Sequence, residues 1–262
     1  MERVKKIYES VDAIVWFILV FVIVALIFVP NFATESNITN IFSQACVLLT
    51  VACGVHFSVL NGGVDFSSTS IIALTCVVGA SIMSTTSGLL AGKWYAIPVA
   101  LLAMLLIGLV FGIINGFAVT RFKMPSFIVT MATQMIGSGL AVVYTGGSTI
   151  SGLPESFTIL GNGKIFVIPF ALILALLVAV VTHLVCSKTL YGRQLYATGT
   201  NPKASVISGV PVKKTIFKIF IFSGVCSAVA GIIMMAQMES GASSYGSTLF
   251  IDIMGSIIVG GT

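Results

Sequence analysis

An all-α polytopic membrane protein with seven or eight transmembrane helices is the fold class that this sequence predicts. Of its 262 residues, 57% are hydrophobic and only 8% are charged, whereas a soluble domain carries about 25% charged residues. The apolar residues form successive runs of roughly 20, the length of a helix that crosses a bilayer. Lysine and arginine gather in the polar breaks between these runs, where they fix the orientation of a membrane protein.

Seven apolar runs can be read as spans, and an eighth begins near Leu249 and reaches the end of the chain. The seven are 13–30, 41–60, 67–84, 94–119, 126–145, 165–186 and 215–236. The third is short for a span, and the first lacks the small-residue site of a cleaved signal peptide. We interpret 1–262 as a single transmembrane domain, and we expect it to be incomplete at its C-terminus.

The distribution of positive charge predicts a cytoplasmic N-terminus. If the spans alternate in direction from there, only Lys93 and Lys164 of the thirteen basic residues lie outside. The basic residues that then lie inside are Arg3, Lys5, Lys6, Arg121, Lys123, Lys188, Arg193, Lys203, Lys213, Lys214 and Lys218. Because lysine and arginine near a span resist translocation, this bias favours that orientation.

The connection between the second and third runs, residues 61–70, reads NGGVDFSSTS and places Asp65 among apolar segments. Two hypotheses remain open. In the first, this is an ordinary cytoplasmic turn, and a hydrated Asp65 caps the third span through backbone N–H groups of its first turn. In the second, the segment is a broken or re-entrant stretch, and Asp65 faces a cavity at membrane depth.

Polar and small residues inside the fourth and fifth runs indicate contacts between helices. Gly108, Gly112 and Gly116 lie on one face of the fourth helix, which allows close approach of a neighbouring helix. Asn115 needs a hydrogen-bond partner in lipid, and a bond to the next helix is favoured over contact with a transported solute. For Gln134 the same two alternatives remain equal.

The longest polar interruption is the segment 187–214, which contains five of the thirteen basic residues together with several glycines and prolines. Its positive charge places it on the cytoplasmic side. Its small residues suit close docking, so we interpret it as the surface where a soluble subunit acts on the membrane part.

Motifs of catalysis and metal binding are absent from the sequence. It contains no phosphate-binding G-x-x-x-x-G-K-[ST] loop, no H-E-x-x-H and no G-x-S-x-G. His56 and His183 each stand alone, and none of the five cysteines forms a C-x-x-C pair. We therefore expect no enzyme activity, no catalytic residue, no metal and no cofactor in this chain; if ATP drives it, another chain hydrolyses the ATP.

Four stretches carry a family resemblance: NGGVDFSSTSIIAL (61–74), GIINGFAVTRFKMPSFIVTMAT (112–133), YGRQLYATGTNPKASVISGVPVKK (191–214) and AGIIMMAQMESGASSYGSTLFIDIMGSIIVGGT (230–262). They resemble the membrane permeases of the ribose-type ABC importers, which carry simple sugars and related small polar solutes. Members of that family continue past the final GGT of this chain through further spans. We therefore expect the chain to be C-terminally truncated relative to them.

The resemblance implies a machine of several subunits in a bacterial plasma (inner) membrane. Two copies of the permease, or two related permeases, form the pore. Cytoplasmic ATPase subunits use the ATP and bind the coupling loop 187–214, and an extracytoplasmic solute-binding protein delivers the solute. The residues expected at the ATPase contact are Arg193, Ala197, Gly199, Asn201, Ala204, Ser208 and Gly209.

The leading functional hypothesis is a permease subunit that forms the path for a monosaccharide such as ribose, or for a related small polar solute. Three alternatives stay open. In the first alternative, the same machine carries nucleosides, autoinducer-type solutes or branched-chain amino acids. In the second, the chain is a secondary transporter coupled to ions through Asp65 and Asp252. In the third, it is a non-transporting remnant. The expected path residues combine aromatic faces with hydrogen-bonding groups, and they are Asn61, Asp65, Phe66, Asn115, Phe127 and Gln134.

Overall fold

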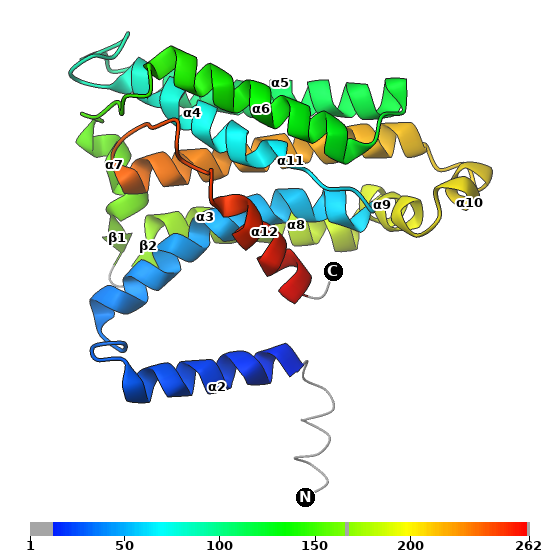
Figure 1. Ribbon diagram of the computed structural model, residues 1–262, viewed down its shortest axis with the longest axis horizontal. Helices are drawn as coiled ribbons and strands as arrows, with labels where there is room; N and C mark the ends of the chain where they lie inside the picture. Colours follow the sequence, from blue (N-terminus) through cyan, green and yellow to red (C-terminus); the bar gives the residue numbers. More distant parts are fainter. Residues whose placement is uncertain (1–12, 166–167, 261–262) are drawn as a thin grey trace, which may run out of the picture. The chain divides into compact units, whose positions relative to one another are not determined.

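The computed structural model of the protein describes residues 13–165 and 168–260 (Figure 1). Nearly all regular structure in these residues is helical, and the two short strands pair as an antiparallel hairpin. The elements are α2 (Ala13–Phe28), α3 (Glu35–Leu60), α4 (Ser67–Met83), α5 (Ala96–Phe122), α6 (Ser126–Thr145), α7 (Glu155–Asn162), β1 (Lys164–Ile165), β2 (Ile168–Pro169), α8 (Phe170–Lys188), α9 (Leu190–Thr200), α10 (Pro202–Ile207), α11 (Val212–Met238) and α12 (Leu249–Val259). The expected all-α polytopic fold class is confirmed.

Within the described residues, five helices are long and apolar enough to cross a membrane, namely α3, α5, α6, α8 and α11. The shorter apolar helices are α2, α4 and α12, so the third predicted span is indeed short. The sixth predicted span begins at Phe170 instead of residue 165, because Lys164 and Pro169 pair in the hairpin that precedes it. The polar stretch before that hairpin contains the short helix α7.

The chain divides into two compact units, Met1–Phe42 and Ser43–Thr262. In the first unit most side chains of α2 are exposed, as expected of an apolar helix whose surroundings are lipid. Beyond α2 the chain turns at Asn31, which adopts a positive φ of 63°, a conformation that asparagine tolerates at helix ends. The amide of Asn37 donates a hydrogen bond to the carbonyl of Phe32 at 2.8 Å and fixes this turn.

In the second unit, α4 is the most deeply buried helix, and its neighbours are α5, α6 and α11 (Figure 1). Its first turn is made of hydroxyl residues, Ser67, Ser68 and Thr69, all of which are buried. Because protein surrounds this helix, these hydroxyl groups find hydrogen-bond partners that hydrocarbon would not offer. The result is a polar cluster at one end of an otherwise apolar helix.

Close packing of α5 against α11 follows from the glycines that the sequence places on one face. A Cβ added to Gly108 would overlap the carbonyl oxygen of Gly224, and one added to Gly112 would lie 2.5 Å from the carbonyl oxygen of Phe220. The third glycine, Gly116, meets the backbone of Phe217 in the same way. The expected glycine contact between helices is therefore present, with α11 as the partner.

We expect Gly108→Ala to lower the thermal unfolding midpoint by several degrees. The new methyl group overlaps the backbone of α11, and overpacking of this kind costs about 1–3 kcal/mol in the free energy of unfolding. Gly139→Ala in α6 is the matched control, because a Cβ there meets nothing within 4 Å and alanine favours a helix by about 1 kcal/mol over glycine. Equal midpoints for the two variants in a detergent thermal-shift assay would contradict the close packing.

Candidate functional site

The break between α3 and α4 is made by a glycine. Gly62 has a positive φ of 71°, its N–H donates to the carbonyl of Val59 at 2.8 Å, and the N–H of Gly63 donates to that of Ser58 at 2.9 Å. This is the hydrogen-bond pattern of a helix that ends at a glycine. The chain then runs through residues 61–66 without helical structure before α4 begins, within the stretch where the sequence predicts a break.

Asp65 lies in this connection and is only 1% exposed. Its Oδ1 accepts hydrogen bonds from the backbone N–H and the hydroxyl of Ser67, at 3.0 and 2.6 Å. Its Oδ2 accepts one from the hydroxyl of Ser223 in α11, at 2.6 Å. The hypothesis that Asp65 is hydrated is therefore wrong, but the hydrogen bond that the same hypothesis expected to the first turn of α4 is confirmed. The three bonds allow the carboxyl group to be buried.

Hydrogen bonds continue from Asp65 into α5 and α6. The amide nitrogen of Asn115 donates to the hydroxyl of Ser67 at 2.8 Å, and its amide oxygen accepts from the hydroxyl of Thr133 at 2.8 Å. Asn115 thus bonds to neighbouring helices, which is the interpretation that the sequence favoured. We call these five buried residues, Asp65, Ser67, Asn115, Thr133 and Ser223, the Asp65 network; it joins α4, α5, α6 and α11.

Of the four remaining expected path residues, Gln134, Phe66 and Phe127 lie in three different settings, and Asn61 lies where α3 ends. Gln134 donates to the hydroxyl of Thr69 at 3.2 Å and so joins α6 to α4. The half-buried ring of Phe66 stacks on Phe250 of α12, with centroids 4.1 Å apart. Phe127 is 49% exposed at the start of α6. The structure thus links Asp65, Asn115 and Gln134 to α4, whereas a role of all six residues in a transport path stays a prediction.

The segment 187–214 contains two short helices, α9 and α10, and α9 is anchored in the bundle. Leu195 of α9 is fully buried in a cluster with Phe57 of α3 and Ile219 of α11. The hydroxyl of Ser205 in α10 donates to the carbonyl of Ala197 at 2.7 Å and ties α10 to α9. The contacts of α9 therefore connect α10 to the membrane helices α3 and α11.

Three of the residues expected at an ATPase contact have roles inside this segment. A Cβ on Gly199 would overlap the carbonyl oxygen of Leu60, so this glycine lets α9 approach the end of α3. The side chain of Asn201 accepts from the N–H of Ala204 at 3.0 Å and caps α10. Gly209 supplies a turn with a positive φ of 80°.

The outer surface of α9 and α10 is both basic and apolar. Arg193, Ala204 and Ser208 are exposed there, and so are Val206 and Ile207, at 61% and 88%. We call these five residues the α9–α10 surface. Val206 and Ile207 are not among the contact residues expected from the sequence, although neighbouring exposed apolar side chains are a sign of a contact surface.

Within the described part of the chain, two buried polar atoms at the junction of α9 with α3 have no hydrogen-bond partner, namely the side-chain oxygens of Asn61 and Thr198. The backbone of Asn61 lies beside Gly199, the residue that follows Thr198. A buried polar atom without a partner costs about 1–3 kcal/mol.

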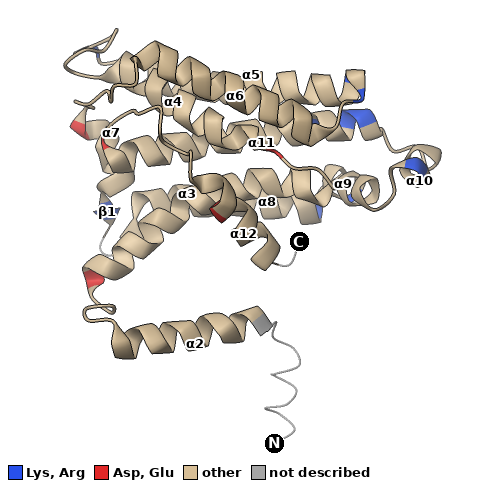
Figure 2. Cartoon of the chain, viewed as in Figure 1, with Lys and Arg blue, Asp and Glu red and all other residues tan. Residues whose placement is uncertain are grey.

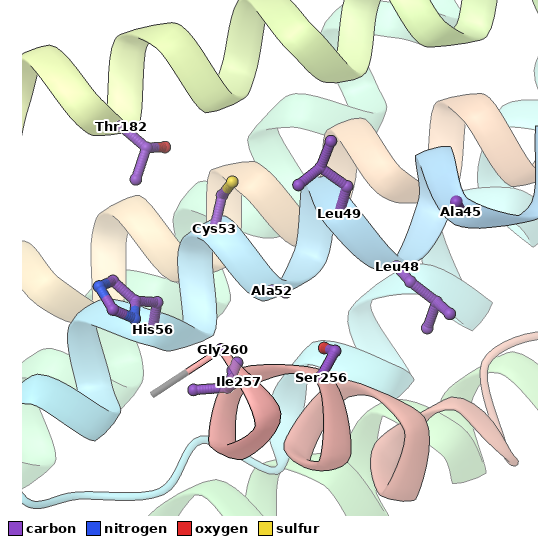
Figure 3. A pocket seen from close by; sticks show the side chains of 10 residues that line it. All are labelled: Ala45, Leu48, Leu49, Ala52, Cys53, His56, Thr182, Ser256, Ile257 and Gly260. Atoms are coloured by element: carbon purple, nitrogen blue, oxygen red, sulfur yellow. The ribbon is translucent and has the colours of Figure 1, made fainter. Parts of the chain in front are cut away.

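A cavity of about 500 Å³ lies between α3, α8 and α12. Figure 3 shows Cys53 and His56 on α3, with Thr182 of α8 and Ser256 of α12 around the same space. None of the six expected path residues lines this cavity. Among the described residues, no group of three metal-ligating side chains comes together.

Comparison with known proteins identifies the family. A family model for the permease component of branched-chain amino acid transport systems matches residues 37–262. The chain is also 34% identical over 248 residues to the ribose import permease protein RbsC of Bacillus subtilis, which covers 93% of this chain and 74% of the relative. The chain belongs to the ribose-type ABC importer permease family.

Other relatives in this permease family are named for further sugars. The L-arabinose transport system permease protein AraH of Escherichia coli is 33% identical over 256 residues, covering 98% of this chain and 75% of the relative. The D-allose transport system permease protein AlsC of the same organism is 32% identical over 231 residues, covering 88% and 69%. No solved structure matches the chain. The family resemblance of the four sequence stretches is thus confirmed.

Proposed function

We propose that this permease forms the membrane path for a monosaccharide and is driven by separate ATPase subunits. Relatives named for ribose, L-arabinose and D-allose support a monosaccharide over nucleosides, autoinducer-type solutes or branched-chain amino acids. The observation that carries the proposal is the α9–α10 surface, which combines exposed apolar and basic side chains and is anchored to membrane helices through Leu195. A permease that is driven by a separate ATPase needs a docking surface that is anchored to its membrane helices.

The proposed orientation places the N-terminus and the α9–α10 surface in the cytoplasm of a bacterium with the chain in its inner membrane. Figure 2 shows lysine and arginine gathered where α9, α10, the end of α5 and the start of α11 lie, whereas α7 at the other end carries acidic colour. This supports the positive-inside orientation. The basic residues of the N-terminus, Arg3, Lys5 and Lys6, lie outside the described residues.

The proposed assembly contains ATPase subunits at the α9–α10 surface, a solute-binding protein at the opposite end and a second permease copy or paralogue. In this assembly ATP-driven movement of the ATPases displaces α10 and α9. The contact of Gly199 with Leu60 passes the displacement to the end of α3 and to the connection that carries Asp65. The permease itself performs no chemistry; it changes between two arrangements of its helices.

The α9–α10 surface is tested with Ile207→Asp. Ile207 is 88% exposed, so the variant leaves the fold intact, but it places a charge in the proposed apolar contact. We expect recovery of the ATPase subunit with the permease in detergent to fall at least about tenfold, the equivalent of about 1.4 kcal/mol. The matched control is Leu89→Asp, an equally apolar side chain that is 76% exposed before α5, and it should leave recovery unchanged.

The solute is tested by uptake into proteoliposomes that contain the permease, its ATPase and its binding protein. We expect ATP-dependent uptake of a monosaccharide, with no uptake of leucine or of a nucleoside. Uptake that needs a sodium or proton gradient instead of ATP would overturn the proposal in favour of ion coupling. Recovery of the ATPase that is insensitive to Ile207→Asp would remove the α9–α10 surface from the proposal.

A further inference from the structure

A groove beside the start of α11 combines a cationic pocket with an apolar pocket. The cationic pocket has a volume of about 280 Å³ and is lined by Thr120, Lys213, Lys214, Phe217 and Lys218. The apolar pocket has a volume of about 430 Å³ and is lined by Val185, Thr189, Tyr191, Lys218, Ile221, Phe222 and Val225. Lys218 lines both, so the two pockets meet at its side chain.

The position of the Lys218 charge is fixed by Tyr191 of α9. The ammonium nitrogen lies 5.6 Å from the centre of the tyrosine ring, within the range of a cation–π interaction. The tyrosine ring is held in turn, because its hydroxyl donates to the carbonyl of Thr215 at 3.3 Å and its centroid lies 6.2 Å from that of Phe57. Burial raises the pKa of the Tyr191 phenol, so it remains a neutral hydrogen-bond donor.

The two pockets follow the polarity of a membrane surface. Lys213 and Lys214 belong to the first turn of α11, and Lys218 comes about one turn later. The apolar lining lies further along the same helix, at Ile221 and Val225, on the part of α11 that is apolar enough to cross the membrane. A molecule that fills both pockets therefore has a negatively charged head and an apolar tail.

We propose that this groove binds an anionic phospholipid, with its phosphate beside the three lysines and an acyl chain along α11. Basic pockets between membrane helices suit such headgroups, and each lysine near an anionic lipid contributes roughly fivefold in affinity. The apolar pocket extends along α11 as far as Val225, into the part of the helix that is apolar enough to cross the membrane, which favours an acyl chain over a soluble protein partner. This assignment is independent of the proposed transport function, because it concerns only the purified chain and lipid.

The proposal is tested by native mass spectrometry of the purified chain after exchange into detergent with equal amounts of phosphatidylglycerol and phosphatidylcholine. We expect the wild-type chain to retain phosphatidylglycerol in clear excess. Lys214→Gln combined with Lys218→Gln should lower the ratio of the two lipids roughly 20-fold, because two headgroup contacts are lost. Val225→Trp, which fills the apolar pocket, should lower retention of both lipids and leave their ratio unchanged.

The matched control combines Lys93→Gln with Lys203→Gln, which removes the same charge away from the groove and should leave the ratio unchanged. Lys214→Arg with Lys218→Arg should keep the wild-type ratio and shows that the fold tolerates change at these positions. An unchanged ratio in the glutamine variant, or an equal loss in the control, would overturn the proposal. Release of the lipid by millimolar inorganic phosphate would also overturn it, because the lysines would then serve a free anion.

Discussion

Asp65→Ala is expected to abolish ATP-dependent uptake and to lower the free energy of unfolding of the second unit by about 3–5 kcal/mol. The carboxyl group accepts three hydrogen bonds in a buried setting, from the backbone and hydroxyl of Ser67 and from Ser223. Each of these bonds contributes about 0.5–1.5 kcal/mol, and each buried donor left without a partner costs about 1–3 kcal/mol. The measurements are uptake into proteoliposomes and the thermal unfolding midpoint.

Two further variants separate the Asp65 network from a simple effect of charge. Asp65→Asn keeps the shape and one acceptor, and the hydroxyl of Ser223 can accept from its new amide, so we expect an intermediate loss. Asp252→Ala removes an exposed carboxylate on α12 and should leave both stability and uptake near wild type. If instead Asp65 and Asp252 variants lose uptake together without any loss of stability, the ion-coupled alternative gains support over the network.

Gly199→Ala is expected to reduce uptake at least about tenfold while the ATPase subunit still co-purifies with the permease. A Cβ at this position overlaps the carbonyl oxygen of Leu60, so α9 must move away from the end of α3, at a cost of about 1–3 kcal/mol. The α9–α10 surface itself remains intact, because Ile207 and its neighbours face outward. The variant therefore interrupts transmission of the movement and leaves binding unaffected.

The measurements for Gly199→Ala are co-purification with the ATPase subunit and uptake into proteoliposomes from the same preparation. Gly139→Ala, with no atom within 4 Å of the new methyl group, is the control and should behave as wild type in both. Normal uptake with Gly199→Ala would contradict the contact with Leu60 as a route of transmission. Loss of ATPase recovery would instead place Gly199 on the docking surface itself, as the sequence resemblance implied.

Properties that depend on local composition could be predicted from the sequence. Hydrophobicity over about 20 residues determines whether a helix crosses the membrane, so the spans and the all-α fold followed from composition. The spacing of Gly108, Gly112 and Gly116 predicted a close helix contact, because residues four apart share a helix face. The connection at residues 61–70 was likewise predicted, and Gly62 ends α3 there because glycine adopts a positive φ without strain.

The partners in these contacts were decided by the tertiary structure alone. Asp65 and Ser223 are separated by 158 positions in the chain, and small hydroxyl residues are common in membrane helices, so nothing local marks Ser223 or Thr133 as partners. Gly199 shows the same limit, because the family resemblance implied a residue at the docking surface. Only the position of Leu60 reveals that the absence of a side chain at Gly199 brings α9 against α3. The local sequence pattern determines where helices form and which face packs, whereas the fold determines which atoms meet.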